Sequence, residues 1–240
     1  MDKIAIIVAA GSGSRMGTGL PKQFLPIAGK PIVLYTLESF IKAYNDLHII
    51  LVLPLEQIQY GQKLIDQTPY KEKVKIIAGG DSRFASVAKG IDCINSEAIV
   101  FVHDGVRCLI KPELIQQCYQ EALLSGSAIP ACPATDSMRI VEKSGQQTRS
   151  RSIDREKIRL IQTPQTFKAT LLKKAFNQPF KDSFTDEASV LESIGESITL
   201  INGDMENIKI TRPIDLIIAE AIIARRKTGH DRTPITSSIN

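Results

Sequence analysis

Residues 4–22 read IAIIVAAGSGSRMGTGLPK, and this stretch decides the fold. Residues 4–10 form a short apolar run with β-branched side chains, which is typical of a buried parallel strand. The glycine-rich loop that follows, residues 11–19, lets backbone N–H groups approach a ligand closely because glycine has no Cβ. The stretch therefore favours an α/β sheet with a ligand-binding loop at the end of its first strand.

The next part of the chain alternates between short apolar runs and amphipathic segments. The pattern predicts strands at 48–53, 74–78 and 98–103, and helices at 31–44, 56–67, 82–92 and 112–124. Asp81 or Ser82 is expected to cap the third of these helices. The alternation predicts one Rossmann-like α/β domain over residues 1–226, an open, mostly parallel sheet with helices on both faces.

The pattern changes after residue 129. Two modest strands, at 137–141 and 147–153, flank the turn Lys143-Ser144-Gly145 and indicate a protruding β-hairpin. A lone hairpin is marginally stable, so we expect this arm, about residues 132–155, to pack against a second copy of the chain in a homodimer.

The C-terminal part predicts further elements and a tail. Helices are expected near 170–176, 186–194 and 213–226, with a strand at 197–201. Residues 227–240 are polar and aperiodic, and we expect them to be disordered.

Composition excludes several classes of protein. The 240 residues carry a formal net charge of +4, which is too mild to indicate a nucleic-acid partner. No stretch approaches the roughly 18 apolar residues of a membrane helix, and no signal peptide is expected. The cysteines form no CxxC pair and indicate buried free thiols in a cytoplasmic protein rather than a zinc site; they are Cys93, Cys108, Cys118 and Cys132.

The first loop does not match two familiar phosphate-binding designs. It lacks the Gly-Lys-Ser/Thr of a P-loop, and its glycines do not follow the GxGxxG spacing of a dinucleotide site. What remains is a loop with two cations, Arg15 and Lys22, which suits the charge of a nucleoside triphosphate. From these residues alone, a glycine-rich surface turn with solvated basic side chains stays an alternative.

Six segments together resemble a known family. They are AAGSGSRMGTGLPKQF (9–24), GGDSRFASV (79–87), VHDGVR (102–107), DREKIRLIQTPQTF (154–167), TDEASVLE (185–192) and NIKITRP (207–213). The chain is similar to the sugar-phosphate nucleotidyltransferases and, among them, to the 2-C-methyl-D-erythritol 4-phosphate cytidylyltransferase family. The resemblance covers about residues 4–226. It departs at Gly105, Val106 and Cys108, where the family pattern reads HDAARP.

The resemblance implies transfer of a cytidylyl group from CTP to 2-C-methyl-D-erythritol 4-phosphate, with Mg²⁺ or another divalent cation bound mainly by the CTP phosphates. The implied catalytic residues are Arg15, Lys22, Arg155 and Lys209. The implied nucleotide-binding residues are Ala9, Ala10, Gly11, Gly13, Gly80, Asp81, Ser86 and Asp104, with Asp104 also a candidate metal ligand. The implied acceptor-binding residues are Arg107, Ser137, Thr163 and Thr185. Arg155 is expected to act either in its own subunit or across the dimer.

Three alternative functions are considered as well. Ribitol-5-phosphate cytidylyltransferase is a sister activity, although its first loop tends to read AGG where this chain reads AAG. An NAD(P)-dependent dehydrogenase needs a ribose-binding carboxylate after the second strand, and this chain has Pro54 at that turn. A nucleotide-sensing scaffold has no need of Arg15, Lys22, Arg155 and Lys209 together.

Overall fold

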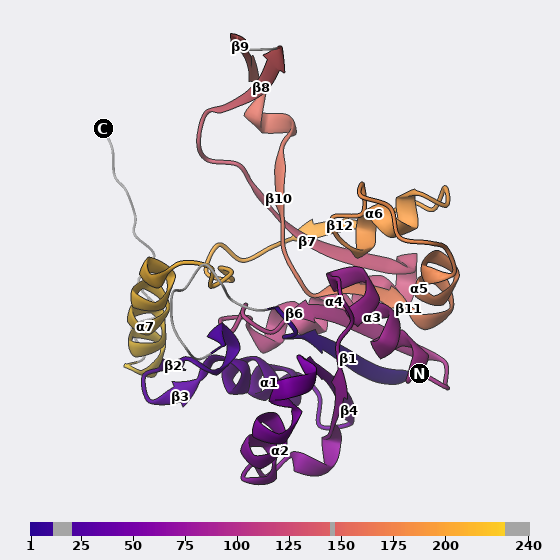
Figure 1. Cartoon of the computed structure of the whole chain (residues 1–240), viewed down its shortest axis with the longest axis vertical. Coiled ribbons are helices and arrows are strands. Elements are labelled where there is room, and N and C mark those ends of the chain that lie inside the picture. The colour runs from indigo at the N-terminus through magenta and orange to yellow at the C-terminus, as the bar shows by residue number, and fades with distance from the viewer. Residues whose placement is uncertain (12–20, 145–146, 229–240) are drawn as a thin grey trace.

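The computed structural model describes residues 1–11, 21–144 and 147–228 (Figure 1). Gly13 and Arg15, which the sequence analysis assigns to the ligand-binding loop, lie outside the described residues. So does most of the predicted tail, although its first residue, Lys227, still belongs to the last helix.

The described residues form an eight-stranded main sheet. Its spatial order is β10 (Arg159–Ile161), β7 (Ser127–Pro133), β11 (Gln165–Lys168), β6 (Ala98–Asp104), β1 (Asp2–Val8), β4 (Leu47–Leu53) and β5 (Val74–Ala78), with β12 (Leu200–Asn202) paired to β7. Strands β6, β1, β4 and β5 are parallel, as the sequence predicts. Strand β11 is antiparallel to both of its neighbours, so the sheet is mostly but not wholly parallel.

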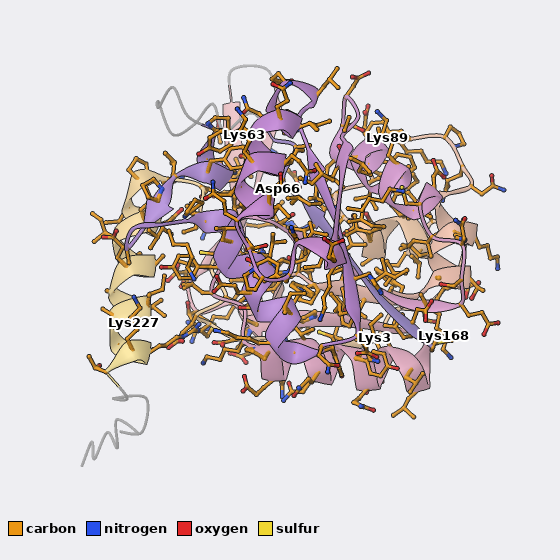
Figure 2. The ribbon with its side chains drawn as sticks, turned by 90° about the horizontal axis from the view of Figure 1, so that it is seen from below. Lys3, Lys63, Asp66, Lys89, Lys168 and Lys227 are labelled. Carbon is orange, nitrogen blue, oxygen red and sulfur yellow. The ribbon has the colours of Figure 1, made fainter. Side chains whose placement is uncertain are left out.

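Helices cover both faces of this sheet (Figure 1). They are α1 (Ile32–Ala43), α2 (Ile58–Asp66), α3 (Arg83–Asp92), α4 (Pro112–Ser125), α5 (Ala169–Phe176) and α6 (Glu187–Glu192). Helix α7 (Pro213–Lys227) lies to one side of the sheet (Figure 1) and packs in a separate cluster with Ile27 and Leu109. Each of these helices agrees with a predicted helix to within about two residues at either end. In α2, Ile65 is buried while Lys63 and Asp66 lie at the outer surface (Figure 2).

The core follows from the two-residue period of a strand. In β1, Ile7 packs in the cluster that contains Phe40 of α1, whereas the adjacent Ile6 packs in the cluster that contains Val87 of α3 and Leu172 of α5. Because both faces of β1 are covered, its residues form a continuous apolar run instead of an alternating one.

The sequence analysis missed β7, β10 and β11, and it placed β12 about three residues too early. Pro130 lies inside β7, and proline has no N–H to donate to a ladder, so the segment looked like a break. Its carbonyl is nevertheless used, because it accepts a hydrogen bond of 2.8 Å from the N–H of Gln162.

The predicted hairpin strands are present as β8 (Met138–Ser144) and β9 (Gln147–Ile153). They pair antiparallel in a two-stranded sheet of their own and lie away from the main sheet in Figure 1. A second small sheet pairs β2 (Pro26–Ile27) with β3 (Lys30–Pro31). Within the described part of the chain, no helix is long and apolar enough to cross a membrane.

Candidate functional site

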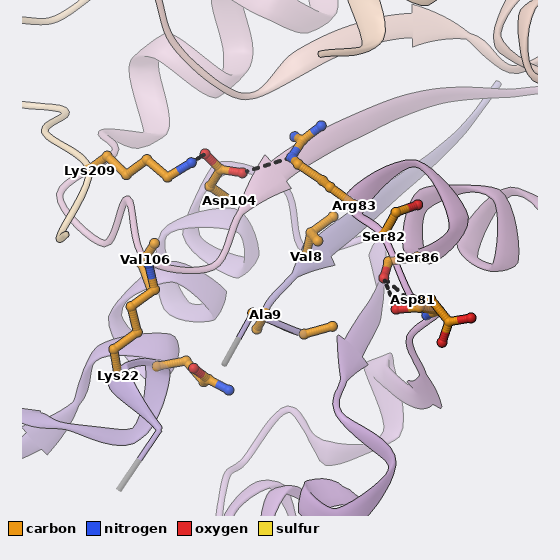
Figure 3. Close-up of a pocket in the computed structure, with 14 residues that line it drawn as sticks. Val8, Ala9, Lys22, Asp81, Ser82, Arg83, Ser86, Asp104, Val106 and Lys209 are labelled. Atoms are coloured by element: carbon orange, nitrogen blue, oxygen red, sulfur yellow. Dashed lines mark hydrogen bonds and ion pairs between the residues drawn. The ribbon is translucent and has the colours of Figure 1, made fainter. Parts of the chain in front are cut away.

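The carboxyl ends of β1, β4 and β6 meet at one edge of the sheet. Val8 is in register with Asp104 on one side and Val52 on the other, and the N–H of Gly105 donates to the carbonyl of Val8 at 2.9 Å. A cavity of about 390 Å³ opens at this edge (Figure 3). Open α/β sheets bind ligands at this position, and the volume suits a nucleotide-sized molecule.

The start of the chain forms one wall of the cavity. Ala9, Ala10 and Gly11 follow β1 directly, and the 3-10 helix η2 (Lys22–Phe24) adds Lys22 and Gln23. Gln23 is buried, and its Nε2 has no hydrogen-bond partner among the described residues. The sequence analysis did not select Gln23, because an amide beside a lysine carries no distinctive signal.

The turn between β5 and α3 forms a second wall. Ser82 is the N-cap of α3, since its hydroxyl accepts from the N–H of Ala85, and Asp81 is free to line the cavity. The hydroxyl of Ser86 accepts from the N–H of Gly80 at 3.1 Å and fixes the turn. A Cβ on Gly80 would lie 2.6 Å from the Cβ of Ala85, so this close turn requires glycine.

Asp104, the last residue of β6, is surrounded by cations. Its Oδ2 lies 2.8 Å from Nζ of Lys209 and 3.7 Å from Nε of Arg107, and its Oδ1 accepts from Nε of Arg83 at 3.3 Å (Figure 3). Burial alone would raise the pKa of Asp104, but Arg83 and Lys209 outweigh it and hold that pKa well below its usual range. Asp104 is therefore ionised and tethers three basic side chains at the cavity.

Arg83 and Glu187 were not predicted as site residues. Arg83 is the first residue of α3 and lines the cavity, and both of its terminal nitrogens donate to Glu187, the first residue of α6. Burial raises the pKa of Glu187, while burial lowers that of Arg83 less than the two neighbouring carboxylates raise it. The sequence feature that could have indicated Glu187 is its place as the acidic first residue of the helix EASVLE, which has an apolar face.

Thr163 and Arg107 lie beside the cavity without lining it. The hydroxyl of Thr163 accepts from the N–H of Asp104 at 3.1 Å, and Nη1 of Arg107 donates to the carbonyl of Asn207 at 2.8 Å. Asn207 in turn donates to the carbonyl of Thr163 at 2.9 Å. These bonds connect the end of β6 to the segment that carries Lys209.

Three predicted site residues, Arg155 among the catalytic ones and Ser137 and Thr185 among the acceptor-binding ones, do not line this cavity. Arg155, in the 3-10 helix η5 (Arg155–Lys157), donates to the carbonyl of Thr135 at the base of the hairpin. Ser137 is exposed just before β8. Thr185 precedes α6 but does not cap it, because Asp186 accepts from the N–H of Ser189 and is the N-cap. The fold of one chain therefore brings Lys22, Asp104 and Lys209 together, but not Arg155.

The described residues do not form a metal site by themselves. Throughout residues 1–11, 21–144 and 147–228, no three His, Cys, Asp or Glu side chains are grouped to hold an ion. Both oxygens of Asp104 face basic side chains, and this environment does not fit a metal ligand. The four cysteines are free thiols, as expected; Cys108, Cys118 and Cys132 are buried, whereas Cys93 is half-buried rather than buried.

Known proteins resemble this chain over nearly its whole length. The family model IspD, 2-C-methyl-D-erythritol 4-phosphate cytidylyltransferase, matches residues 3–225. A Bacteroides fragilis protein named 2-C-methyl-D-erythritol 4-phosphate cytidylyltransferase is 43% identical over 223 residues, which cover 93% of this chain and 100% of the relative. A Porphyromonas gingivalis protein of that name is 40% identical over 222 residues, covering 92% of this chain and 97% of the relative.

Solved structures agree with the sequence relatives. The structure of 4-diphosphocytidyl-2C-methyl-D-erythritol synthase from Anaerococcus prevotii matches with a TM-score of 0.79 and 26% identity, covering 93% of this chain and 97% of that one. The 2-C-methyl-D-erythritol 4-phosphate cytidylyltransferase of Thermus thermophilus matches with a TM-score of 0.73 and 28% identity, covering 93% and 100%. The chain therefore belongs to the IspD family of 2-C-methyl-D-erythritol 4-phosphate cytidylyltransferases.

Proposed function

We propose that the cavity at the carboxyl edge of β1 and β6 is where this chain transfers a cytidylyl group from CTP to 2-C-methyl-D-erythritol 4-phosphate, a step of isoprenoid biosynthesis. One observation carries the proposal. Basic side chains from three distant parts of the sequence, Lys22, Arg83 and Lys209, line the same cavity beside a close glycine turn. Such a cavity suits a substrate pair that carries several phosphate groups.

The reaction needs no protein nucleophile. A phosphate oxygen of the acceptor attacks the α-phosphorus of CTP, and a new O–P bond forms. The bond from the α-phosphorus to the bridging oxygen breaks, and pyrophosphate leaves with that electron pair. Because negative charge accumulates around the α-phosphorus, catalysis consists of placing the two substrates in line and neutralising that charge.

On the nucleotide side, Lys22 is assigned to the phosphoryl group in transfer, together with Arg15 from outside the described residues. Ala9 lies across the cavity from Asp81 and Ser86 (Figure 3), and Ala10 and Gly80 also line it. We assign the cytosine and ribose to the gap between these two walls, where backbone groups can contact the base edge. The remaining nucleotide-side residues, Gly11 and Gly13, belong to the first loop.

On the acceptor side, Lys209 and Arg107 are assigned to the attacking phosphate. Arg155 is assigned to the same phosphate in a second copy of the chain, because it lies at the hairpin and does not line the cavity of its own chain. The homodimer is part of this proposal, with β8 and β9 as its contact. If the partner subunit supplies a residue that binds the substrate, the site of an isolated monomer is incomplete.

In this proposal, Mg²⁺ binds to the phosphates of CTP and not to a dedicated protein site, since Mg²⁺ commonly binds substrate phosphates and keeps several waters. No described side chain is assigned to it. Asp104 is assigned instead to holding Lys209, Arg107 and Arg83.

The test is pyrophosphate release, with CTP, UTP, ATP and GTP each combined with 2-C-methyl-D-erythritol 4-phosphate and with ribitol 5-phosphate. Turnover is expected to be highest for CTP with 2-C-methyl-D-erythritol 4-phosphate. A preference for ribitol 5-phosphate would replace the acceptor in this proposal, and release from no combination would refute the proposal as a whole.

A further inference from the structure

A continuous chain of ion pairs runs from the interior of the protein to the cavity. It begins at Glu187 on α6, passes through Arg83 at the start of α3 and Asp104 at the end of β6, and ends at Lys209. The two carboxylates are the buried members: the side chain of Glu187 is 2% exposed and that of Asp104 10%, against 30% for Arg83 and 41% for Lys209 at the cavity end. This series of ion pairs therefore links a buried carboxylate to an exposed ammonium group at the cavity.

The geometry of Arg83 divides its donors between two carboxylates. Its Nη2 donates to Oε2 of Glu187 at 3.1 Å and its Nη1 to Oε1, so both terminal nitrogens are held by Glu187. Its Nε donates to Oδ1 of Asp104 at 3.3 Å. An arginine and a carboxylate prefer the paired, two-bond arrangement, and Glu187 has it.

Glu187 does not line the cavity, so contact with a substrate there does not explain its charge. A buried carboxylate is unfavourable unless it is paired and hydrogen-bonded. Among the described residues, Arg83 is the basic side chain that pairs with it. The pair fixes the direction of Arg83, and that direction decides how much of Asp104 is left for Lys209.

We propose that Glu187 is a positioning residue for the acceptor phosphate, because it occupies the paired donors of Arg83 and so leaves Oδ2 of Asp104 to hold Lys209 at the cavity. This inference rests on the proposed function, in which Lys209 binds that phosphate. Without the charge of Glu187, the planar end of Arg83 turns to the nearest remaining carboxylate, Asp104. Arg83 then competes with Lys209 for the same two oxygens, and Lys209 loses its fixed position.

The main variant is Glu187→Gln, which keeps the shape of the side chain and removes its charge. The expected result is an increase of about tenfold in KM for 2-C-methyl-D-erythritol 4-phosphate, with KM for CTP and kcat within about twofold of the unchanged protein. Glu192→Gln is the matched control, since Glu192 is an exposed acid on the same helix. It should leave all three parameters unchanged.

A double variant separates positioning from a purely structural role. If competition by Arg83 causes the defect, Glu187→Gln has no further effect on KM for the acceptor in a protein that already carries Arg83→Gln, because no competitor remains. A purely structural role predicts that the double variant is worse than either single variant. Glu187→Asp retains the charge and should raise KM for the acceptor less than Glu187→Gln; it also serves if Glu187→Gln does not fold.

The outcomes are distinguishable. A fall in melting temperature with unchanged KM for the acceptor in Glu187→Gln or Glu187→Asp would overturn the inference, as would an equal rise in KM for both substrates. Failure of the unchanged protein to use 2-C-methyl-D-erythritol 4-phosphate would instead overturn the proposed function on which the inference rests.

Discussion

Oγ1 of Thr163 lies 3.0 Å from Nδ1 of His103, a buried ring next to Asp104. The carbonyl of Arg107 lies 3.1 Å from Nε2 and can only accept, so the proton of the neutral ring is on Nε2. Nδ1 is therefore the acceptor, and the hydroxyl of Thr163 donates to it while accepting from the N–H of Asp104. His103 is therefore a neutral spacer under Asp104 and not a catalytic base.

The neutral ring gives a prediction for stability against pH. Burial lowers the pKa of His103 to about 4, against about 6.5 in an unfolded chain. Between these values only the unfolded state binds the proton, so the free energy of unfolding falls as pH falls. For His103 this loss is expected to be about 2 kcal/mol between pH 7 and pH 5.

Urea unfolding at the two pH values checks the sign and the size of this effect. His103→Gln retains one donor and one acceptor but does not titrate, so its loss of stability between pH 7 and pH 5 should be smaller by about that amount. An equal loss in both proteins would show that His103 is not the group responsible.

Lys22→Ala is expected to lower kcat by about 10²-fold, because a fixed cation at the developing charge typically contributes about 3 kcal/mol to the transition state. Steady-state pyrophosphate release at saturating CTP and acceptor measures it. Lys75→Ala, which removes an exposed lysine on β5 outside the cavity, is the control and should retain full turnover. Near-normal turnover of a folded Lys22→Ala protein would remove Lys22 from the mechanism.

The position of Arg155 predicts complementation between two inactive variants. If each site uses Lys22 of one subunit and Arg155 of the other, a mixed dimer of Lys22→Ala and Arg155→Ala has one intact site and one doubly defective site. Random reassociation of equal amounts makes about half of the dimers mixed, so about a quarter of the full activity should return. If Arg155 acts in its own subunit, every site contains a substitution and mixing restores nothing.

The glycine turn before α3 gives a prediction for stability. In Gly80→Ala the new Cβ would lie 2.6 Å from the Cβ and 3.1 Å from the backbone carbonyl carbon of Ala85, and a helix backbone cannot easily move away. The free energy of unfolding is expected to fall by about 1–3 kcal/mol. Gly11→Ala is the matched control, since its Cβ would meet nothing within 4 Å among the described residues, and its urea midpoint should be nearly unchanged. Equal midpoints for the two variants would contradict the steric argument.

The sequence predicted the parallel half of the fold because each of its strands is a separate apolar run. Strands β1, β4, β5 and β6 are covered on both faces, so burial is visible in each of them without knowledge of the neighbours. Strand β11 is different. Its four residues, QTFK, are a strand only because β6 and β7 lie on either side of them, and a local pattern does not contain that information.

The site was predictable to the extent that its residues lie in recognisable segments. Lys22, Asp104 and Lys209 were selected, and the fold brings them to one cavity. Arg83 lies inside the quoted segment GGDSRFASV but was not selected, because its role depends on Glu187, about a hundred positions later in the chain. Pairings between distant residues are set by the tertiary fold, and no single segment shows them.

The site residues lie far apart in the sequence, so they are synthesised at different times during translation. The ribosome adds Lys22 early, Asp104 near the middle and Lys209 only after most of the chain has been made. A growing chain therefore acquires its nucleotide-side cation long before the acceptor-side cation. Any translation product that stops before Lys209 lacks the group assigned to the incoming phosphate, so truncated products are expected to be inert rather than partly active.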